Sequence, residues 1–194
     1  MKDNYLRSIF ENTETHEIRK YEKFVIFSDL HMGDGGGNDD FLKNSELFKN
    51  VLLNYYLKDD YYLILNGDIE ELQRFDQKKI YQKWEKVYNL FDRFKIKNKL
   101  FKIYGNHEYL IYKNKTIQNY EILSGIKLRY KENTIFIYHG HQTYPFFENY
   151  YLLTSVFLKY FASWLGIKNY TVSKDSKKKY VVEKITYDFS RKNK

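Results

Sequence analysis

Polar motifs that directly follow short apolar runs constrain the fold of this chain more than any other feature. Mostly apolar residues fill four short stretches, at residues 24–27, 62–65, 100–104 and 134–138. Each stretch has the length and composition of a buried strand. The motifs that follow are Asp29-Leu30-His31, Gly67-Asp68, Gly105-Asn106-His107-Glu108 and His139-Gly140-His141. Because open α/β sheets bind ligands at the carboxyl ends of their strands, the pattern predicts an α/β fold with one site at that edge.

The segments between the first three runs predict two helices. Residues 41–55 carry apolar side chains at helical spacing, and Asn38-Asp39-Asp40 before them offers an N-cap. The apolar face of this first helix comprises Phe41, Leu42, Leu47, Phe48, Val51, Leu52 and Tyr55. Residues 78–96 predict a second amphipathic helix, whose apolar face comprises Ile80, Trp84, Val87, Tyr88, Phe91 and Phe94. Strand–helix–strand repetition predicts right-handed parallel crossovers.

The two ends of the chain differ in character from this core. Residues 1–22 are polar and predict an irregular or short helical lead-in, in which His16 is exposed. Residues 126–138 alternate as a β-hairpin that turns around Glu132-Asn133. Residues 146–165 predict an aromatic helix, and a lysine-rich helical pattern follows at 171–194. We therefore predict one domain over residues 1–194, with its core at 23–145 and a helical C-terminal region at 146–194.

Charge and composition limit the partners and the compartment. The net charge of +8 favours anionic partners, namely phosphorylated substrates, nucleic acid or anionic membranes, although a general bias toward Lys, Asn, Ile and Tyr also produces it. The chain has no cysteine, so disulfides and thiolate zinc sites are excluded. It also lacks a signal-peptide core at its start and an uncharged run near the roughly 20 residues that span a bilayer. These features predict a cytoplasmic protein, with peripheral membrane contact as an option.

The four motifs, in this order, resemble those of the calcineurin-like metallophosphoesterase superfamily over residues 23–145. Residues 28–34 resemble in particular the branch that contains UDP-2,3-diacylglucosamine diphosphatases. The resemblance implies a β-sandwich flanked by helices, and an enzyme that hydrolyses a phosphate ester or diphosphate with two divalent metal ions. Asp, His and Asn side chains suit Mn, Fe or Zn in such a centre.

The resemblance also implies a role for individual residues. Asp68 would bridge the two metals, Asp29 and His31 would bind the first, and Asn106 and His139 would bind the second. Taken alone, Asp29 and His31 are also consistent with strand-end capping and a surface imidazole. Their combination with the other motifs favours the ligand interpretation.

Four further residues are candidates around this centre. His107 would give a proton or hydrogen bond to the leaving oxygen, work that suits an imidazole because its pKa lies near neutrality. Glu71 stands where the family often has an acid that orients this histidine, although a solvated carboxylate at a helix start is the alternative. His141 is a candidate supporter of a ligand rather than a ligand itself. Asp34 either borders the pocket or belongs to a plain loop.

The chain departs from the family in one respect. The Gly-His-x-His motif that normally supplies one imidazole to each metal is absent, and none of the five histidines follows His141. We therefore expect a fold that is incomplete at its C-terminus. Phosphorylated small molecules or lipid precursors are the expected substrates. The alternatives are a catalytically impaired scaffold and a nuclease. The helix at 146–165 has three interpretations: it packs in the core, it forms a lid over a lipid tail, or it lies at a membrane interface.

Overall fold

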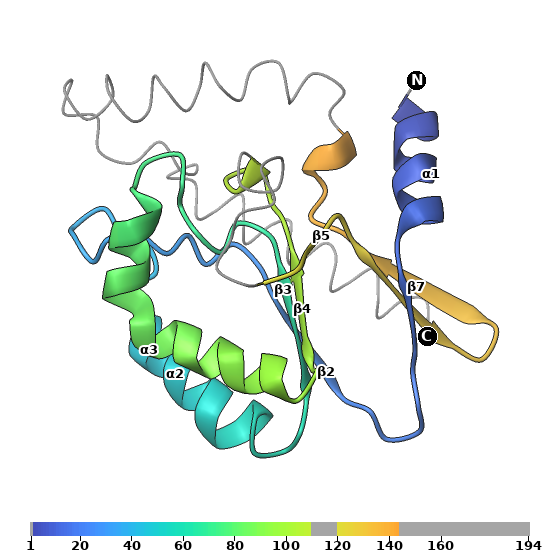
Figure 1. Ribbon diagram of the computed structural model, residues 1–194, viewed down its shortest axis with the longest axis horizontal. Helices are drawn as coiled ribbons and strands as arrows, with labels where there is room; N and C mark the ends of the chain where they lie inside the picture. The colour runs from blue at the N-terminus through green and yellow to red at the C-terminus, as the bar shows by residue number, and fades with distance from the viewer. Residues whose placement is uncertain (1, 110–119, 144–194) are drawn as a thin grey trace, which may run out of the picture.

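Two β-sheets lie face to face, and helices cover the outer face of one of them (Figure 1). The computed structural model describes residues 2–109 and 120–143, with side chains from residue 6 onward. The larger sheet has four parallel strands in the order β2 (Phe24–Phe27), β3 (Tyr62–Asn66), β4 (Leu100–Ile103) and β5 (Ile122–Leu123). The mixed α/β class predicted from the sequence is confirmed, and β2, β3 and β4 coincide with the first three apolar runs.

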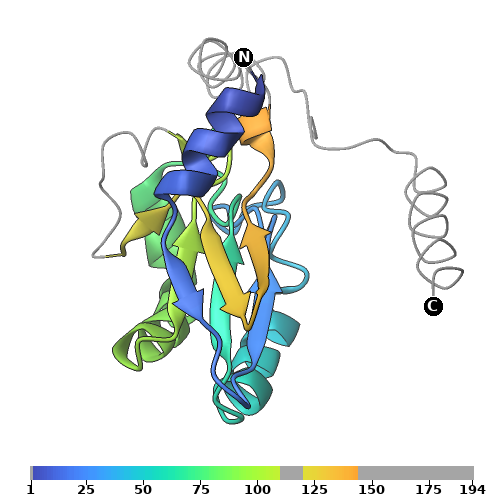
Figure 2. The same cartoon turned by 90° about the vertical axis from the view of Figure 1, so that its right-hand side faces the viewer.

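The smaller sheet closes the sandwich (Figure 2). It consists of β1 (Thr15–Glu17), β6 (Ile126–Tyr130) and β7 (Asn133–Ile137), in that order. β1 pairs with β6 in parallel, and β6 and β7 form the predicted antiparallel hairpin. Its turn lies at Lys131 and Glu132, one residue earlier than expected, because Tyr130 already pairs with Asn133.

The alternation of side chains along β3 explains why this sheet is buried on both faces. Leu63 and Leu65 point toward the helices, whereas Ile64 points toward the smaller sheet. Ile64 and Ile103 pack there against Ile126 of β6. Adjacent residues of a strand face opposite sides, so a continuous apolar run supplies both cores at once.

Helix α3 (Gln77–Ile96) covers the outer face of the larger sheet as predicted. All six residues of its expected apolar face are buried. The described chain contains four further helical segments. They are α1 (Lys2–Asn12), α2 (Ser45–Val51), the π-helical turn η1 (Leu52–Tyr56) and the 3-10 turn η2 (His141–Thr143).

The prediction for residues 41–55 is wrong at its start. The helix begins at Ser45, and Leu42, Leu47 and Tyr55 are exposed. Asp39 caps no helix; its carboxylate accepts hydrogen bonds from the backbone of Gly35 and Phe41 and from the Trp84 indole. The side chain that looked like an N-cap therefore organises the preceding loop, which holds Phe41 in the core without a helix.

The prediction of an exposed His16 is also wrong. His16 lies in β1, its imidazole is 3.0 Å from the Glu22 carboxylate, and its ring packs against Phe24 and Tyr62. The lead-in forms α1 and a sheet strand because β6 offers an edge for β1 to pair with. β1 has only three residues, which is too short to show a periodic pattern, so the sequence could not predict this long-range pairing.

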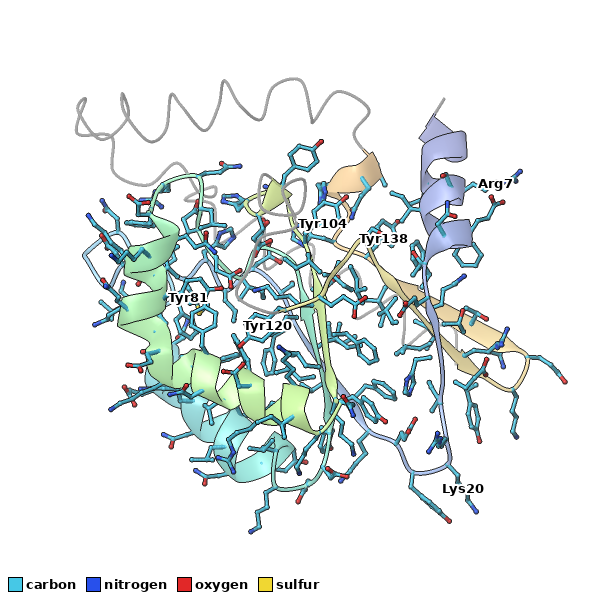
Figure 3. The ribbon with its side chains drawn as sticks, in the orientation of Figure 1. Arg7, Lys20, Tyr81, Tyr104, Tyr120 and Tyr138 are labelled. Carbon is cyan, nitrogen blue, oxygen red and sulfur yellow. The ribbon has the colours of Figure 1, made fainter. Side chains whose placement is uncertain are left out.

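A buried ion pair lies between the larger sheet and α3, where Lys102 Nζ is 5.9 Å from the centre of the Tyr120 ring. Figure 3 labels Tyr120 and Tyr81 in this part of the molecule. The Lys102 ammonium is 2.5 Å from Glu70 Oε1, which also accepts a hydrogen bond from the Tyr88 hydroxyl. Both charged side chains are almost completely buried. Removing one partner of such a pair leaves an uncompensated charge in the core, so Lys102 and Glu70 are required together.

The predicted helices at 146–165 and 171–194 lie outside the described residues. Among the described helices, none has both the length and the apolar composition needed to cross a membrane.

Candidate metal centre

The loops after β2 and β3 run side by side beyond the ends of their strands. The backbone amide of Asp29 donates to Gly67, that of His31 to Asp68, and that of Glu71 to Met32. Backbone hydrogen bonding between the two parallel segments therefore continues past the edge of the sheet, but less regularly than within it. It brings the first two motifs together at the carboxyl ends of the strands, the edge at which open α/β sheets hold ligands.

Three candidate ligands have an unusual backbone conformation. Asp29, His31 and Asp68 all lie in the left-handed region, with φ values of 55°, 49° and 53°. This region is unfavourable for non-glycine residues, and such conformations persist where surrounding structure enforces them, often at functional sites. The hydrogen bonds between the two loops provide that enforcement here.

Glycines in the motifs allow the side chains to approach one another. A Cβ atom at Gly67 would lie 2.5 Å from His139 Nδ1, and one at Gly105 would collide with Asp68 Oδ1. Gly67 also has a φ of +79°, which suits a residue without a side chain. The glycine before Asp68 and the glycine before Asn106 are therefore required by close packing of the site.

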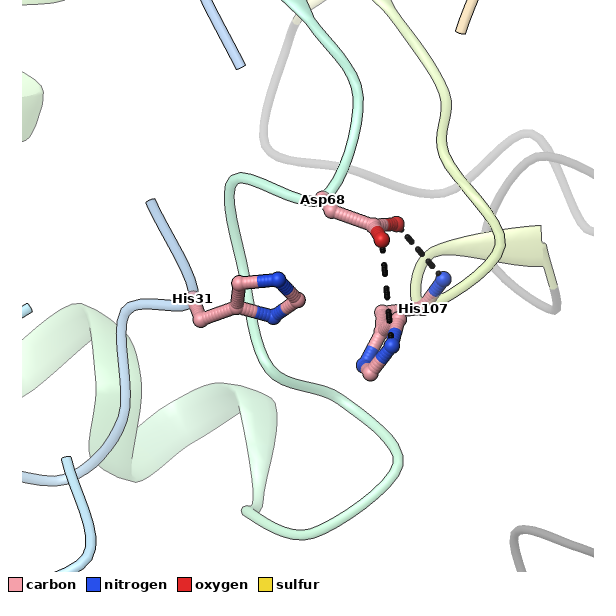
Figure 4. Close-up of side chains that lie close together, drawn as sticks. All are labelled: His31, Asp68 and His107. Carbon is pink, nitrogen blue, oxygen red and sulfur yellow. Dashed lines mark hydrogen bonds and ion pairs between the residues drawn. The ribbon is translucent and has the colours of Figure 1, made fainter. Parts of the chain in front are cut away.

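Asp68 lies at the centre of two groups of possible metal ligands. One group is His31, Asp68 and His107, and the other is Asp29, Asp68 and His139. Within each group the ligand atoms all lie within 4.8 Å of one another. Figure 4 shows the first group, in which Asp68 Oδ1 accepts the backbone amide of His107 and Oδ2 is 3.7 Å from His107 Nε2. Asp29 and His31, which the family resemblance assigns to one metal, fall in different groups, but His31 Nε2 lies 3.8 Å from Asp29 Oδ1.

Asn106 joins the second group through His139. His139 Nδ1 donates to the backbone carbonyl of Asn66 at 2.8 Å. That bond leaves Nε2 as the nitrogen that faces the site, 3.3 Å from both Asp68 Oδ2 and Asn106 Oδ1. A ring held by one nitrogen, with the other aimed at carboxylate and amide oxygens, is the usual arrangement of a metal-binding histidine.

Glu71 contacts both imidazoles of the first group. Its Oε1 is 2.7 Å from His107 Nδ1, and its Oε2 is 3.0 Å from His31 Nδ1. The carboxylate is almost completely buried, and the two rings lie 4.7 Å apart at a steep angle. The alternative of a solvated carboxylate at a helix start is therefore wrong. The contact with His31 was not foreseen, because it depends on how the two loops align.

The charges of these groups reinforce one another. Burial lowers the pKa of His31, but the carboxylates of Asp29 and Glu71 outweigh it and raise the pKa to about 10. Burial raises the pKa of Glu71, but the two imidazoles outweigh it and lower the pKa to about 2. The His31 imidazole, whose Nε2 is 3.8 Å from Asp29 Oδ1, likewise lowers the pKa of Asp29 to about 2. The site is thus a cluster of carboxylates that needs positive charge beside it.

Glu108 is a residue whose role the sequence did not reveal. Its buried carboxylate accepts hydrogen bonds from the backbone amides of Asp68, Ile69, Glu70 and Gly105. These amides belong to the loops after β3 and β4. Burial raises the pKa of Glu108, whereas the Lys102 ammonium and the hydrogen bond from the Glu70 amide lower it. The position of Glu108 at the end of a motif was visible, but nothing in the sequence assigned it to backbone amides.

The remaining candidates lie at the margin. His141 is buried with its ring 4.9 Å from that of Tyr104, and burial lowers its pKa to about 4. It belongs to neither ligand group. Asp34 accepts the backbone amide of Gly36 and thus forms a local turn, as the plain-loop interpretation predicted.

Residues 22–189 match the profile of the calcineurin-like phosphoesterase family. The match covers most of the chain. The chain belongs to this family. It is therefore a phosphoesterase-family protein of the metal-dependent kind, and the mixed α/β fold is the fold of that family. Comparisons with curated proteins and with solved structures found no significant match.

The residues present fit a divalent metal ion. The donor set consists of carboxylate, imidazole and amide oxygen, which together suit metals of intermediate hardness. The described part of the chain holds the carboxylates and imidazoles in two groups that share Asp68, and the Asn106 amide oxygen lies beside His139 of the second group. The carboxylates around His31 and His139, which raise the pKa of both imidazoles, would also attract divalent cations.

Proposed function

We propose that this protein hydrolyses a phosphate ester or diphosphate at a centre of two divalent metal ions bridged by Asp68. The observation that carries the proposal is the shared position of Asp68 in both ligand groups. When bound, such ions supply a water molecule of lowered pKa as nucleophile and positive charge against the phosphoryl oxygens. The net charge of +8 supports an anionic substrate.

The ligands in this proposal are those that the resemblance implied: Asp29, His31, Asp68, Asn106 and His139. Ser28 adds a support, because its hydroxyl donates to Asp29 Oδ2 at 2.5 Å and so orients that carboxylate. Mn, Fe and Zn remain the proposed ions. Metal analysis of protein loaded with each ion, followed by assays on phosphate monoesters, diesters and diphosphates, tests the ions and the substrate class together.

In this proposal His107 donates a proton to the leaving oxygen. Its Nδ1 is held by the buried Glu71 carboxylate, so its Nε2 faces the site beside Asp68. A hydrogen bond from one ring nitrogen to a carboxylate fixes the tautomer and orientation of the other nitrogen. Delivery of a proton from Nε2 to an oxygen bound near Asp68 requires the imidazolium, in which both ring nitrogens carry a proton and Nδ1 still donates to Glu71.

Replacement of His107 should separate metal binding from proton transfer. We expect His107→Ala to retain its metal content yet lose roughly 10²–10⁴-fold in kcat, the range for general acid assistance. The loss should shrink for nitrophenyl esters, because a good leaving group needs little protonation. Rates over a series of leaving groups, with metal content by mass spectrometry, measure this. An equal loss for every leaving group would assign His107 to metal binding instead.

Glu71 should act on both histidines as a positioning residue. We expect Glu71→Gln to lower kcat by about 10–100-fold, the usual cost of removing a group that supports metal ligands. Metal affinity should fall as well, since His31 loses the same support. Glu71→Asp retains the charge but shortens the side chain, so its carboxylate should reach only one of the two histidines. It should therefore restore kcat and metal affinity to different extents. The exposed Glu85 of α3 is a matched control, and Glu85→Gln should change neither quantity. Normal kcat and metal affinity in Glu71→Gln would exclude the positioning role.

A scaffold without catalytic activity is the second candidate, favoured by the missing Gly-His-x-His motif. The retained ligands, proton donor and supporting carboxylate oppose it. If metal-loaded protein binds phosphorylated compounds yet hydrolyses none of the three substrate classes, the scaffold is correct. The lipid-precursor substrate of the diphosphatase branch is a narrower proposal, and UDP-linked diphosphates belong in the same panel.

A further inference from the structure

A groove lies at the end of the molecule opposite the candidate metal centre. The groove lies between η1 and the C-terminal end of α3 and has a volume of about 590 Å³. Those segments lead directly into β3 and β4, so the groove lies where these parallel strands begin, at the lower edge in Figure 1. None of the residues assigned to the metal centre lines it.

The groove combines apolar and positively charged side chains. Leu53, Leu57 and Ile96 supply the apolar part, and Ile96 is 80% exposed, which is unusual for an isoleucine at a helix end. The charged side chains that line it are Lys58, Arg93 and Lys97. No acidic residue lines the groove, although Asp60 outside it pairs with Lys97 at 3.3 Å.

The same end of the molecule carries further aromatic and basic side chains. Tyr55 is half exposed on η1, and its ring lies 5.9 Å from that of Tyr61. The Lys23 ammonium lies over the Tyr61 ring, and Lys20 lies at the same lower edge in Figure 3. The groove is thus part of a broader edge that carries several lysines and exposed apolar and aromatic groups, with Asp60 paired to Lys97 and Lys99.

We propose that this edge docks the protein on an anionic lipid bilayer. Exposed apolar side chains rimmed by lysine and arginine are suited to the membrane interface, where apolar groups enter the acyl boundary and cations meet the headgroups. The lining carries three cationic side chains and no acidic one, which suits anionic headgroups. The chain's own segment 171–194 is lysine-rich, so it has the wrong charge to fill the groove.

Docking by this edge has a consequence for the metal centre. The centre lies at the carboxyl ends of the strands whose amino-terminal ends meet the bilayer, so it faces the aqueous side. The docked protein would therefore take a phosphorylated substrate from solution. The proposal itself does not depend on the chemistry of that centre, and a protein without activity would dock in the same way.

Sedimentation of the full chain with lipid vesicles tests the proposal. The parent protein should bind vesicles of phosphatidylcholine mixed with phosphatidylglycerol, should not bind phosphatidylcholine alone, and should be released by salt. The double variant Arg93→Gln and Lys97→Gln should weaken binding by about fivefold for each cation removed. Ile96→Asn should weaken it by a similar factor at a salt concentration that screens the charges.

Lys78→Gln with Lys79→Gln is the matched control, because it removes two exposed lysines from the other end of the same helix. This control should change binding less than twofold. Hydrogen exchange locates the surface independently, and the amides of residues 52–58 and 92–99 should gain protection on anionic vesicles. Equal loss of binding in the groove and control variants would overturn the proposal. Failure of the parent protein to bind anionic vesicles would overturn it too, and would leave an acidic protein segment as the matching partner.

Discussion

Asp68→Ala should remove the phosphoesterase activity almost completely. The Asp68 carboxylate belongs to both ligand groups, and its Oδ2 is 3.3 Å from Nε2 of the proposed ligand His139. Its loss should therefore damage both metal sites, whereas Asn106→Ala should weaken mainly one. Metal ions contribute several kcal/mol of transition-state stabilisation, so we expect kcat to fall by roughly 10³-fold or more. Metal content by mass spectrometry and kcat on a nitrophenyl phosphate diester measure the two effects.

The matched control for this prediction is Asp59→Ala, which removes an exposed carboxylate far from the site. It should retain normal metal content and activity. Circular dichroism of Asp68→Ala must show an intact fold, since Asp68 Oδ1 also accepts the backbone amide of His107. Equal metal loading of the parent protein and Asp68→Ala would exclude a bridging carboxylate.

Glu108→Ala should be the most destabilising single substitution among the site residues. The carboxylate accepts four backbone amides, from Asp68, Ile69, Glu70 and Gly105, and it is buried. Each buried donor left without a partner costs about 1–3 kcal/mol, so the loss in free energy of unfolding should reach about 4 kcal/mol or more. A loss of this size is a large part of the stability of an ordinary domain. Urea denaturation measures the change.

Glu132→Ala is the matched control, because Glu132 is an exposed carboxylate in the hairpin turn. Its unfolding midpoint should stay close to that of the parent protein. Glu108→Gln should lie between the two, because its amide oxygen still accepts some of the backbone amides. A Glu108→Ala protein as stable as the parent would show that the two loops hold their shape without this carboxylate.

The elements predicted well are those whose pattern is local. β2, β3 and β4 follow from apolar runs, and α3 follows from a helical stripe whose six residues are all buried. The elements predicted poorly depend on partners distant in sequence. β1 exists because β6 pairs with it, and Asp39 organises a loop because the Trp84 indole reaches it from α3. Local patterns cannot contain these contacts, since each needs a second segment placed by the fold.

For the candidate site, the sequence by itself determined which chemical groups would meet, because carboxylate, imidazole and amide follow strands that end at one edge of a parallel sheet. It also determined the family, through the order of the motifs. Only the tertiary structure decided how these groups are held. Glu71 reaches both His31 and His107, and Glu108 binds the backbone of two loops, because side-chain contacts of this kind depend on ångström-scale alignment of segments 30 to 40 residues apart. Hydrogen bonds are short and directional, so residue identity alone could not fix these partners.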